Sequence, residues 1–379
     1  MIIKMILDNG FDPDVRVYNE AKYLANCGHE IEILCYDGRS KFVMKPTETI
    51  EGFRVKRFFL RSKFGTFLTD RVSFKFRYIY YPLWFIKFYY QIKHYLNRKE
   101  IDYIYSHDLF CAFMSTLFFP KVKKVFDMHE LYKKSEKNFI YNGLCQHLVN
   151  YTQRNSDIIV YVNEVQKDVI ENKSWNKMYY LPNYAILENY STNKSLKKYF
   201  TVSYIGLVRR DDLILNLCEA AAKIDNCKIE VHGKGLTDFG NKSMKMYQNC
   251  NYFGEYNGTL ESRTLFEKCN LLYCVYDIND INWRQAIPVK FYEAMASGTP
   301  VIVSESSKCG DLVKEFDLGY TCKWDDVEGI KKCIKSAMTN KKEYEKKRIN
   351  CINIGKEYSL KTVTSKLSST LEDLLDENN

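Results

Sequence analysis

The chain has 379 residues, of which 46% are hydrophobic and 27% are charged, and its net charge is +9. This length exceeds the usual size of one domain and fits two domains of about 150–200 residues each. The composition is that of a globular protein that can bury a full core. No stretch of the sequence approaches the roughly 20 apolar residues of a membrane-spanning helix, so an integral membrane protein is not expected.

The 13 cysteines are scattered, without a C-x-x-C pair or a Cys/His cluster at the spacing of metal ligands. Neither a disulfide framework nor a zinc site is therefore expected. The first ten residues hold an apolar strand that is too short for a secretory signal. The odd cysteine count and this opening together predict a reducing, cytoplasmic location.

The positive charge is concentrated between Gly52 and Lys99. This segment holds twelve Lys and Arg residues against one acid, Asp70, and therefore carries +11, and it also holds sixteen aromatic residues. Residues 78–90, YIYYPLWFIKFYY, are hydrophobic nearly all round and are broken by Pro82 and Lys87. Two interpretations stay open, a buried helix–loop insert of the first domain or a basic aromatic surface that lies on anionic lipid headgroups. A nucleic-acid partner is not expected, because no DNA- or RNA-binding motif accompanies the charge.

The chain opens with a βαβ pattern. Residues 2–7 predict a strand, residues 15–25 a helix that Gly28 ends, and residues 30–35 a second strand. The loop between the first strand and the helix, DNGFDPD, follows the carboxyl end of a strand, where open α/β sheets bind ligands. It lacks G-x-G-x-x-G, so no dinucleotide fingerprint is present.

Three further predicted strands each end in polar residues. Strands at 101–105, 124–126 and 158–162 are followed by SHD, DMHE and NE. The carboxyl ends of parallel strands meet at one edge of a sheet, so these side chains are expected there. A lone histidine is usually structural, but the position of His107 and His129 at strand ends favours a functional role, above all for His129.

A second α/β series follows a polar run that predicts an interdomain linker. Its first strand, at 199–205, ends at Gly206, and Arg209 and Arg210 lie just beyond it. A helix at 213–222, a strand at 228–232 and a turn at Gly233-Lys234-Gly235 come next. A strand at 271–276 then precedes the polar loop DINDINWRQAI.

Residues 288–300, PVKFYEAMASGTP, predict a short helix that leads into a buried strand. Pro288 suits the first helical turn, and Gly298 suits a left-handed C-terminal cap. The first turn of such a helix presents unpaired N–H groups and a partial positive charge, which favour a phosphate. Lys290 would add a cation there, and Glu293 would accept hydrogen bonds from sugar hydroxyls. The alternative is a Lys290–Glu293 pair on the surface of an ordinary helix.

The patterns predict an α/β protein of two doubly wound domains in series. We expect a first domain over residues 1–185, with the basic aromatic insert at about 52–99, a linker over 186–200 and a second domain over 201–358. The apolar stripe of the last helix needs a partner surface, so residues 359–379 are expected to pack back on the first domain.

The order and spacing of these pieces resemble family 4 of the GT-B glycosyltransferases, which transfer sugars from nucleotide-sugar donors with retention of configuration. The resemblance is carried by residues 14–34, HD at 107–108, FDMHELY at 126–132, LPN at 181–183, YIGLVRR at 204–210 and IPVKFYEAMASGTPVIVS at 287–304. It covers most of the chain but not residues 36–100. It implies the GT-B fold, with two Rossmann-like domains facing across a cleft.

The resemblance also implies roles for single residues. His129 matches the histidine near the reacting sugar and is the implied catalytic residue. On the donor side, Arg209 matches the arginine that grips the diphosphate, with Arg210 as a possible substitute, Lys290 a second phosphate cation and Glu293 the carboxylate that holds the ribose. Gly206 and Gln285 complete the implied donor site. The implied acceptor side consists of Asn9, Gly10, Arg16 and His107.

This sequence departs from the family pattern at Gln285. The family often carries Glu-x7-Glu across the helix, whereas Gln285 stands at the first position here. Either a neutral amide holds the donor sugar or some activity is lost. The Asp-x-Asp metal motif of GT-A transferases is not matched, so no obligatory metal and no other cofactor are expected.

The resulting hypothesis is a cytoplasmic glycosyltransferase that is peripheral on the inner face of the plasma membrane. It would move a hexose from a nucleotide-diphosphate sugar to a glycan or lipid-linked acceptor in surface polysaccharide biosynthesis. Two alternatives stay open, a nucleotide-sugar epimerase of the same fold and a non-catalytic sugar-nucleotide-binding subunit.

Overall fold

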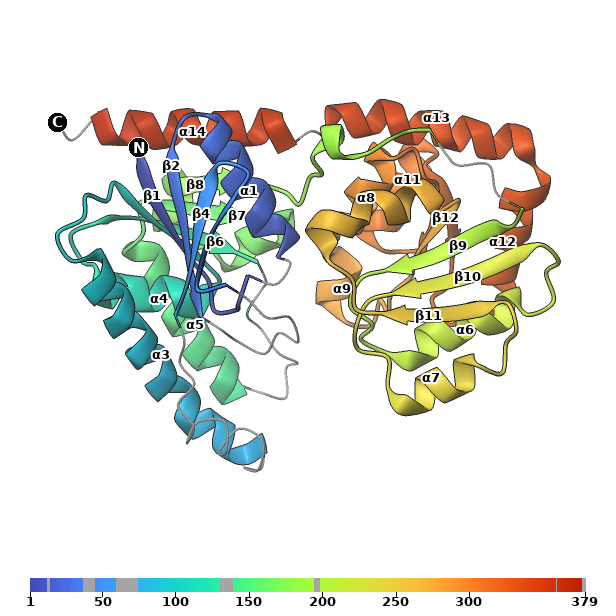
Figure 1. The fold of residues 1–379 in the computed structure, drawn as a ribbon, viewed down its shortest axis with the longest axis horizontal. Coiled ribbons are helices and arrows are strands. Elements are labelled where there is room, and N and C mark those ends of the chain that lie inside the picture. The colour runs from blue at the N-terminus through green and yellow to red at the C-terminus, as the bar shows by residue number, and fades with distance from the viewer. Residues whose placement is uncertain are drawn as a thin grey trace. The chain divides into compact units, whose positions relative to one another are not determined.

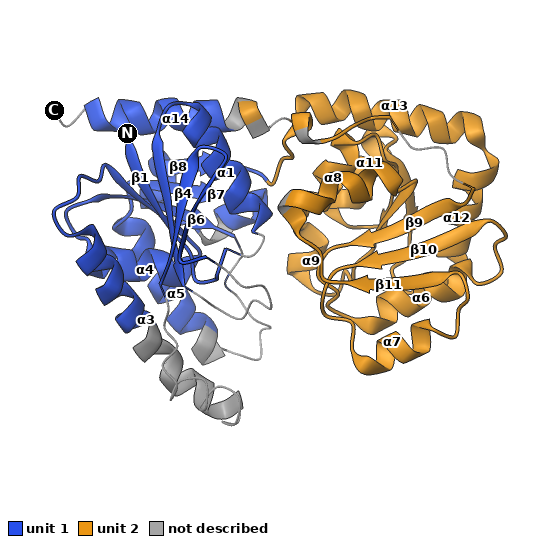
Figure 2. Cartoon of the chain, in the orientation of Figure 1, with its two compact units in different colours: residues 1–182, 362–379 blue, residues 183–361 orange. Residues whose placement is uncertain are grey.

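A computed structural model describes residues 1–11, 14–36, 45–58, 74–129, 132, 139–193, 198–358 and 360–376. The chain forms two compact units, one of Met1–Pro182 with Thr362–Asn379 and the other of Asn183–Lys361 (Figure 2). Residues 186–193, which the sequence analysis assigns to a linker, belong to the second unit. Each unit is described by itself.

Unit 1 is built on an eight-stranded sheet in the order β3-β4-β2-β1-β5-β6-β7-β8. Figure 1 shows the strands of this unit together with the helices α1, α3, α4 and α5. Only β3 and β4 pair antiparallel, and all other neighbours are parallel. The strands are β1 (Ile2–Ile6), β2 (Glu30–Tyr36), β3 (Thr47–Ile50), β4 (Phe53–Phe58), β5 (Tyr103–His107), β6 (Lys123–Met128), β7 (Ile158–Tyr161) and β8 (Met178–Tyr180). The helices are α1 (Val15–Asn26), α3 (Phe74–Leu96), α4 (Leu109–Phe118) and α5 (Phe139–Arg154), with the 3₁₀ helices η1 (Glu164–Val169) and η2 (Asn172–Lys177).

Unit 2 is built on a six-stranded parallel sheet in the order β11-β10-β9-β12-β13-β14. The strands are β9 (Phe200–Ile205), β10 (Cys227–His232), β11 (Cys250–Gly254), β12 (Leu271–Cys274), β13 (Val301–Ser304) and β14 (Gly319–Cys322). The helices are α6 (Asp211–Ala221), α7 (Asp238–Met244), α8 (Gly258–Lys268), α9 (Ile281–Gln285), α10 (Val289–Ala296), α11 (Lys308–Phe316), α12 (Val327–Thr339) and α13 (Lys341–Glu357), with the 3₁₀ helix η3 (Leu187–Asn189).

The strand order explains where a ligand can bind in each unit. In unit 2 the third, second, first, fourth, fifth and sixth strands lie side by side, which is the order of the doubly wound fold. The direction in which successive strands are added to the sheet therefore reverses between β9 and β12, and in unit 1 it reverses in the same way between β1 and β5. Loops leave such a point in opposite directions and open a crevice at the carboxyl ends of the strands. The predicted fold class of two Rossmann-like α/β domains is confirmed.

The central strands are nearly continuous apolar runs because helices cover both faces of a parallel sheet. Every residue of β7 (IIVY), β12 (LLYC) and β13 (VIVS) is buried. The strand that the sequence places at 101–105 lies two residues later, at Tyr103–His107, so His107 is its last residue rather than part of the following loop.

The C-terminal helix α14 (Leu360–Asp376) packs on unit 1. Leu367 and Leu371 are fully buried, and the Leu371 carbonyl accepts a hydrogen bond of 3.0 Å from the Tyr103 hydroxyl. The Ser368 hydroxyl lies 2.6 Å from His29 Nε2. These contacts fix α14 at the edge where β2 and β5 begin, away from the carboxyl ends of the strands.

Part of the basic aromatic segment is core. Helix α3 runs through Pro82. Its C-terminal half buries Phe85, Phe88, Tyr89, Ile92 and Leu96 in one cluster of unit 1. Residues 59–73 lie outside the described part of the chain, so the lipid-surface interpretation stays a prediction for them. Within the described residues, no helix is both long enough and apolar enough to cross a bilayer.

Candidate functional site

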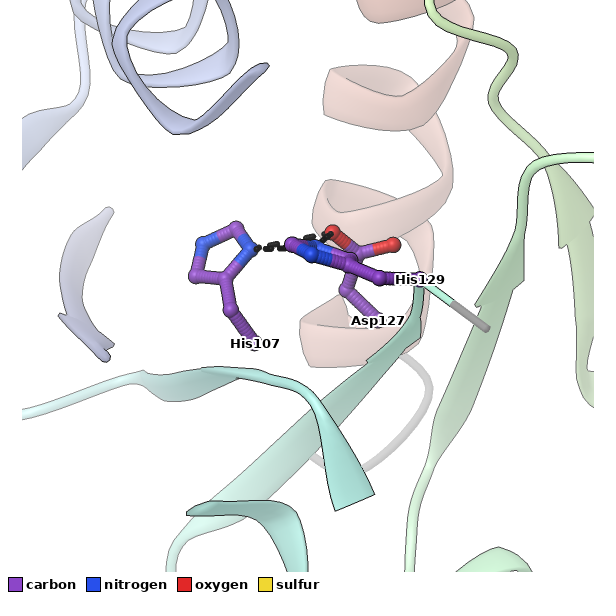
Figure 3. Close-up of side chains that lie close together, drawn as sticks. All are labelled: His107, Asp127 and His129. Carbon is purple, nitrogen blue, oxygen red and sulfur yellow. Dashed lines mark hydrogen bonds and ion pairs between the residues drawn. The ribbon is translucent and has the colours of Figure 1, made fainter. Parts of the chain in front are cut away.

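Three side chains converge where β5 and β6 end in unit 1 (Figure 3). His107 closes β5, Asp127 is the next-to-last residue of β6, and His129 follows that strand directly. Asp127 Oδ2 accepts hydrogen bonds from His107 Nδ1 at 2.9 Å and from His129 Nε2 at 2.7 Å. Because these strands are neighbours and parallel, their carboxyl ends bring the three residues together.

The buried Asp127 carboxylate is also paired with Arg16 of helix α1. Arg16 Nη2 donates to Oδ1 at 2.7 Å and Nε to Oδ2 at 3.0 Å, while Nη1 donates to the Leu181 carbonyl at 2.9 Å. Burial alone would raise the pKa of Asp127, but Arg16 and the two histidines outweigh it and hold that pKa well below its usual range. Removing one partner of such a buried pair costs about 3–5 kcal/mol. Arg16, predicted on the acceptor side, is therefore part of the support of the histidines.

His129 carries a positive charge over the neutral pH range. Its Nδ1 lies 3.6 Å from Asp108 Oδ2, so both ring nitrogens face carboxylates. Burial alone would lower the pKa of His129, but Asp108 and Asp127 outweigh it and raise the pKa to about 10. An imidazolium donates from both nitrogens and accepts at neither. His129 therefore cannot take up a proton as a general base, and its charge is compensated by the two carboxylates.

Asp108 is held in place for this pairing. Its Oδ1 accepts a hydrogen bond of 2.9 Å from the Tyr132 hydroxyl, which in turn accepts one of 3.1 Å from the Leu109 backbone N–H. Asp108 also has a positive φ of 68°, which is unfavourable for a residue with a side chain. Such strain persists only where surrounding contacts enforce it, and it is concentrated at functional sites.

His107, Asp127 and His129 could supply ligand atoms within 4.8 Å of one another, as a metal site would require. The positive charge of Arg16 nearby argues against a metal site. The Arg16 guanidinium already binds both oxygens of Asp127, and a divalent cation would lie beside it. The expectation of no obligatory metal therefore stays a prediction with a physical reason.

The other predicted acceptor-side residues shape the loop after β1. Asn9 Oδ1 accepts from the Phe11 N–H at 2.7 Å, and its Nδ2 donates to Asp14 at 3.3 Å. The Gly10 carbonyl accepts from Arg57 Nε at 2.9 Å. The sequence analysis missed Asp8 in this loop. Burial, and after it the charge of Asp108, raises the pKa of Asp8 to about 6.

In unit 2, the backbone of the loop after β9 lies close to the backbone of the turn that follows β10. Gly206 N donates to the His232 carbonyl and Val208 N to the Lys234 carbonyl, each at 2.8 Å. A Cβ on Gly233 would lie 1.8 Å from the Gly206 carbonyl oxygen, and Gly233 has a positive φ of 141°. Only glycine fits there, so the turn predicted at 233–235 holds the Gly206 loop in its path.

Lys290 and Glu293 are buried, so the interpretation of a surface pair is wrong. Their exposed fractions are 8% and 4%, and nearly all of helix α10 is buried with them. Pro288 is the N-cap of α10 and not its first turn, because its ψ of 154° is extended. Gly298 follows the helix with a φ of 63°, which confirms the predicted left-handed position.

The Lys290 ammonium lies among aromatic rings and next to Gly206. Its Nζ is 3.8 Å from the ring centre of Tyr204 and 5.2 Å from that of Tyr276. It is also 3.4 Å from the point where a Cβ of Gly206 would lie. In the described part of the chain no ion pair and no hydrogen bond engages this ammonium. A buried cation without a direct hydrogen-bond or ion-pair partner is costly. Glu293, the one carboxyl group whose pKa the Lys290 charge acts to lower against the effect of burial, is not in direct contact with it among the described residues.

The two predicted arginines differ in their surroundings. Arg209 has its guanidinium 4.8 Å from the ring centre of Trp283. Arg210 is bound to Asp212 and Asp277, so most of its charge is already compensated. Gln285 is the last residue of helix α9, half-buried, and directly ahead of α10.

Glu293 is oriented by two residues that the sequence analysis missed. Both the Tyr190 hydroxyl and the Ser262 hydroxyl, the latter at 3.0 Å, donate to its Oε1. Burial raises the pKa of Glu293, while these two hydrogen bonds act in the opposite direction. No sequence pattern links Tyr190, in the predicted linker, with Ser262 on α8, so only the fold could reveal this contact.

The sequences of both units match known family models. Residues 14–184 match glycosyltransferase family 4, and residues 190–358 match glycosyl transferases group 1. The chain belongs to the GT-B glycosyltransferases. None of the curated protein sequences matches it.

Solved structures share the fold of this glycosyltransferase over its whole length. Sucrose-phosphate synthase from Thermosynechococcus elongatus is 14% identical with a TM-score of 0.75, and the match covers 100% of both chains. HepE from Anabaena, in complex with UDP and glucose, is 12% identical with a TM-score of 0.72 over 98% of this chain and 100% of that one. WaaG, described as a glycosyltransferase involved in lipopolysaccharide biosynthesis, is 11% identical with a TM-score of 0.65 over 97% and 99%.

From the positive charge on His129 we predict how the unfolding free energy of this glycosyltransferase depends on pH. The pKa of His129 rises from 6.5 to about 10 on folding, so its contribution to stability is complete below pH 6.5 and is lost as the pH rises toward 10. The variant His129→Gln cannot carry the charge. The difference in unfolding free energy between wild type and His129→Gln should therefore be largest near pH 6 and shrink toward pH 9.5.

Denaturant titrations of both proteins across this pH range measure the difference. His94→Gln, at an exposed position on α3, is the matched control for replacing a histidine. A wild-type advantage over His129→Gln that does not change with pH would mean that His129 is neutral in the folded protein.

Proposed function

We propose that this glycosyltransferase uses a nucleotide-diphosphate sugar as donor and binds it in unit 2, at the carboxyl ends of β9 and β12. The observation that carries the proposal is the buried Lys290 ammonium, which forms no direct ion pair and no hydrogen bond with the described residues. Lys290 is in the first turn of α10, where free N–H groups and the helix dipole also favour a phosphate. A diphosphate would supply an anion in direct contact with this ammonium.

The other donor-site residues fit the same ligand. Arg209 forms no ion pair within the described residues and is the second cation for the diphosphate. Gly206 lets the ligand approach the backbone closely, because it has no side chain. Glu293, with Oε1 held by two hydroxyls, presents its other oxygen to the ribose. HepE, which shares the fold, is described in complexes with UDP and with UDP-glucose.

His129 is proposed as the catalytic residue of unit 1, as the family resemblance implies. His107, Arg16 and Asp127 hold the imidazolium, while Asn9 and Gly10 form the acceptor-side loop. Retention of configuration and hexose transfer follow from the family resemblance. In the variant His129→Gln, transfer should fall by two or more decades, roughly the loss of a catalytic group, with nucleotide affinity nearly unchanged.

The acceptor is proposed to be a glycan or a lipid-linked glycan of surface polysaccharide biosynthesis, at the cytoplasmic face of the membrane. WaaG, which shares the fold, is described as acting in lipopolysaccharide biosynthesis. The basic charge of residues 52–99 supports a peripheral membrane location.

The phosphate site is tested by removing its cations. Arg209→Ala and Lys290→Ala should each weaken nucleoside diphosphate binding by roughly 1.5–3 kcal/mol, the range for hydrogen bonds to charged groups. Arg210→Ala is the matched control and should cost less, because Asp212 and Asp277 already bind Arg210. Calorimetry with UDP, GDP and ADP measures the affinities. Unchanged affinity in both Arg209→Ala and Lys290→Ala would refute the site.

Gln285 is proposed to select the donor sugar, because an amide both donates and accepts hydrogen bonds. Gln285→Ala should lower transfer and flatten the discrimination between sugars, with a loss of about 1–3 kcal/mol on the preferred sugar. Affinity for the free nucleoside diphosphate should not change. Gln285→Glu restores the family's carboxylate and should change the ranking of the sugars.

Product analysis in the same assay separates the competing functions. Release of free nucleoside diphosphate indicates a transferase, a changed sugar indicates an epimerase, and binding without turnover indicates a non-catalytic subunit. If Gln285→Ala keeps both the rate and the sugar ranking, Gln285 does not select the sugar.

Membrane association is tested with vesicles. The protein should co-sediment with anionic vesicles, and less so as salt rises, because salt screens exposed charges. Replacing Arg71, Lys75 and Arg77 by Ser should weaken binding; the side chains of these residues lie outside the described part of the chain. The control replaces Lys335, Lys341 and Lys342, which are exposed in unit 2. Equal recovery on neutral and anionic vesicles would exclude an electrostatic mechanism.

A further inference from the structure

We propose that a row of aromatic rings in unit 2 holds the two phosphate-binding cations in place without neutralising them. The rings are those of Tyr204, Tyr276 and Trp283, and the cations are Lys290 and Arg209. The proposal rests on the donor site described above and adds the residues that position it. These aromatic residues act through the cations, so they are positioning residues and not catalytic ones.

One end of the row fixes Lys290. Its Nζ lies 3.8 Å from the ring centre of Tyr204 and 5.2 Å from that of Tyr276, within the distance at which a cation is attracted by the face of a ring. Tyr204 is the next-to-last residue of β9 and is buried, and its hydroxyl donates to the Leu207 carbonyl at 2.7 Å. One residue therefore supports both the lysine and the loop that contains Gly206.

The middle of the row is rigid. The Tyr276 ring is stacked on Trp283, with 4.9 Å between the ring centres and 20° between the planes. The Tyr276 N–H donates to Ser304 Oγ at 2.8 Å, and the same hydroxyl donates to the Tyr276 carbonyl at 2.6 Å. The loop after β12 is thereby bound to the end of β13, so the stacked pair has a fixed position.

The other end of the row fixes Arg209, whose guanidinium lies 4.8 Å from the ring centre of Trp283. Tyr204, Tyr276, Trp283 and Arg209 line one cavity of about 30 Å³, together with Arg210 and Asp277, which are paired with each other. The two cations are thus connected through continuous ring contacts, although they are far apart in sequence.

A ring and a carboxylate would have different effects on a cation that binds phosphate. A carboxylate would orient the side chain but would also cancel its charge and compete with the phosphate. A ring attracts the cation through its quadrupole and leaves the net charge unchanged. Arg210 shows the contrast, since it lies 5.1 Å from the ring centre of Trp324 but is also bound to two carboxylates.

A double-mutant cycle tests whether Trp283 acts through Arg209. The ligand is whichever of UDP, GDP and ADP binds the wild-type protein best, and calorimetry gives its affinity for wild type, Trp283→Leu, Arg209→Ala and the double variant. Trp283→Leu should weaken binding roughly two- to tenfold in the wild-type background. In the Arg209→Ala background the same change should cost less than about twofold, because the cation that it positions is gone.

Two further variants separate positioning from general stability. Trp283→Phe keeps an aromatic face and should recover most of the affinity. Trp324→Leu makes the same substitution beneath the carboxylate-paired Arg210 and should leave the affinity unchanged. Melting temperatures confirm that each variant is folded at the temperature of the measurement.

The outcomes distinguish this inference from the proposed function. A loss from Trp283→Leu that is equal in both backgrounds, or no loss at all, would overturn the inference while leaving the donor site intact. If wild type binds none of the three nucleotides, or if Arg209→Ala and Lys290→Ala bind as wild type does, the donor site fails and the inference with it.

Discussion

The free-energy cost of burying charge governs both sites of this glycosyltransferase. A buried ionised group must be paired, or it shifts its pKa or requires a ligand. In unit 1 the charges are paired within the protein, because Asp127 is surrounded by Arg16, His107 and His129. In unit 2 the Lys290 ammonium is buried without a direct ion pair or hydrogen bond among the described residues. In the proposed function, the first arrangement is complete before the substrate arrives, and the substrate completes the second.

The strand order places these charges where they can act. Both sheets have the doubly wound order, so each has a point where the order of strand addition reverses and where the carboxyl ends of the strands lie open. His107 ends β5, which borders the reversal in unit 1, and His129 follows its neighbour β6. In unit 2, Gly206 follows β9 and Tyr276 follows β12, the two strands that border the reversal. Helix α10 then brings the ammonium of Lys290 between the loops of these two strands.

Local patterns in the sequence predicted the features that depend on neighbouring residues. Periodicity and turn residues predicted the two α/β series, the short helix α10 and the left-handed Gly298. They could not predict contacts between distant segments. The pairing of Arg16 with Asp127 joins residues 111 positions apart, and that of Tyr190 with Glu293 joins residues 103 apart. The surface pair of Lys290 and Glu293 was a plausible alternative because periodicity within one short helix does not reveal that the helix is buried on nearly all sides.

The loop between β12 and α10 shows why a neutral residue fits at position 285. Its two acids are already engaged: Asp277 binds Arg210, and Asp280 Oδ1 caps helix α9 by accepting from the Asn282 N–H at 2.8 Å. With Gln285 at the end of α9, this helix adds no further carboxylate to the loop. Arg209 is oriented from the same helix by the ring of Trp283. A carboxylate at position 285 would add negative charge to a loop whose two acids already have partners. In the proposed function, the amide leaves both cations to the diphosphate and offers the sugar a donor and an acceptor.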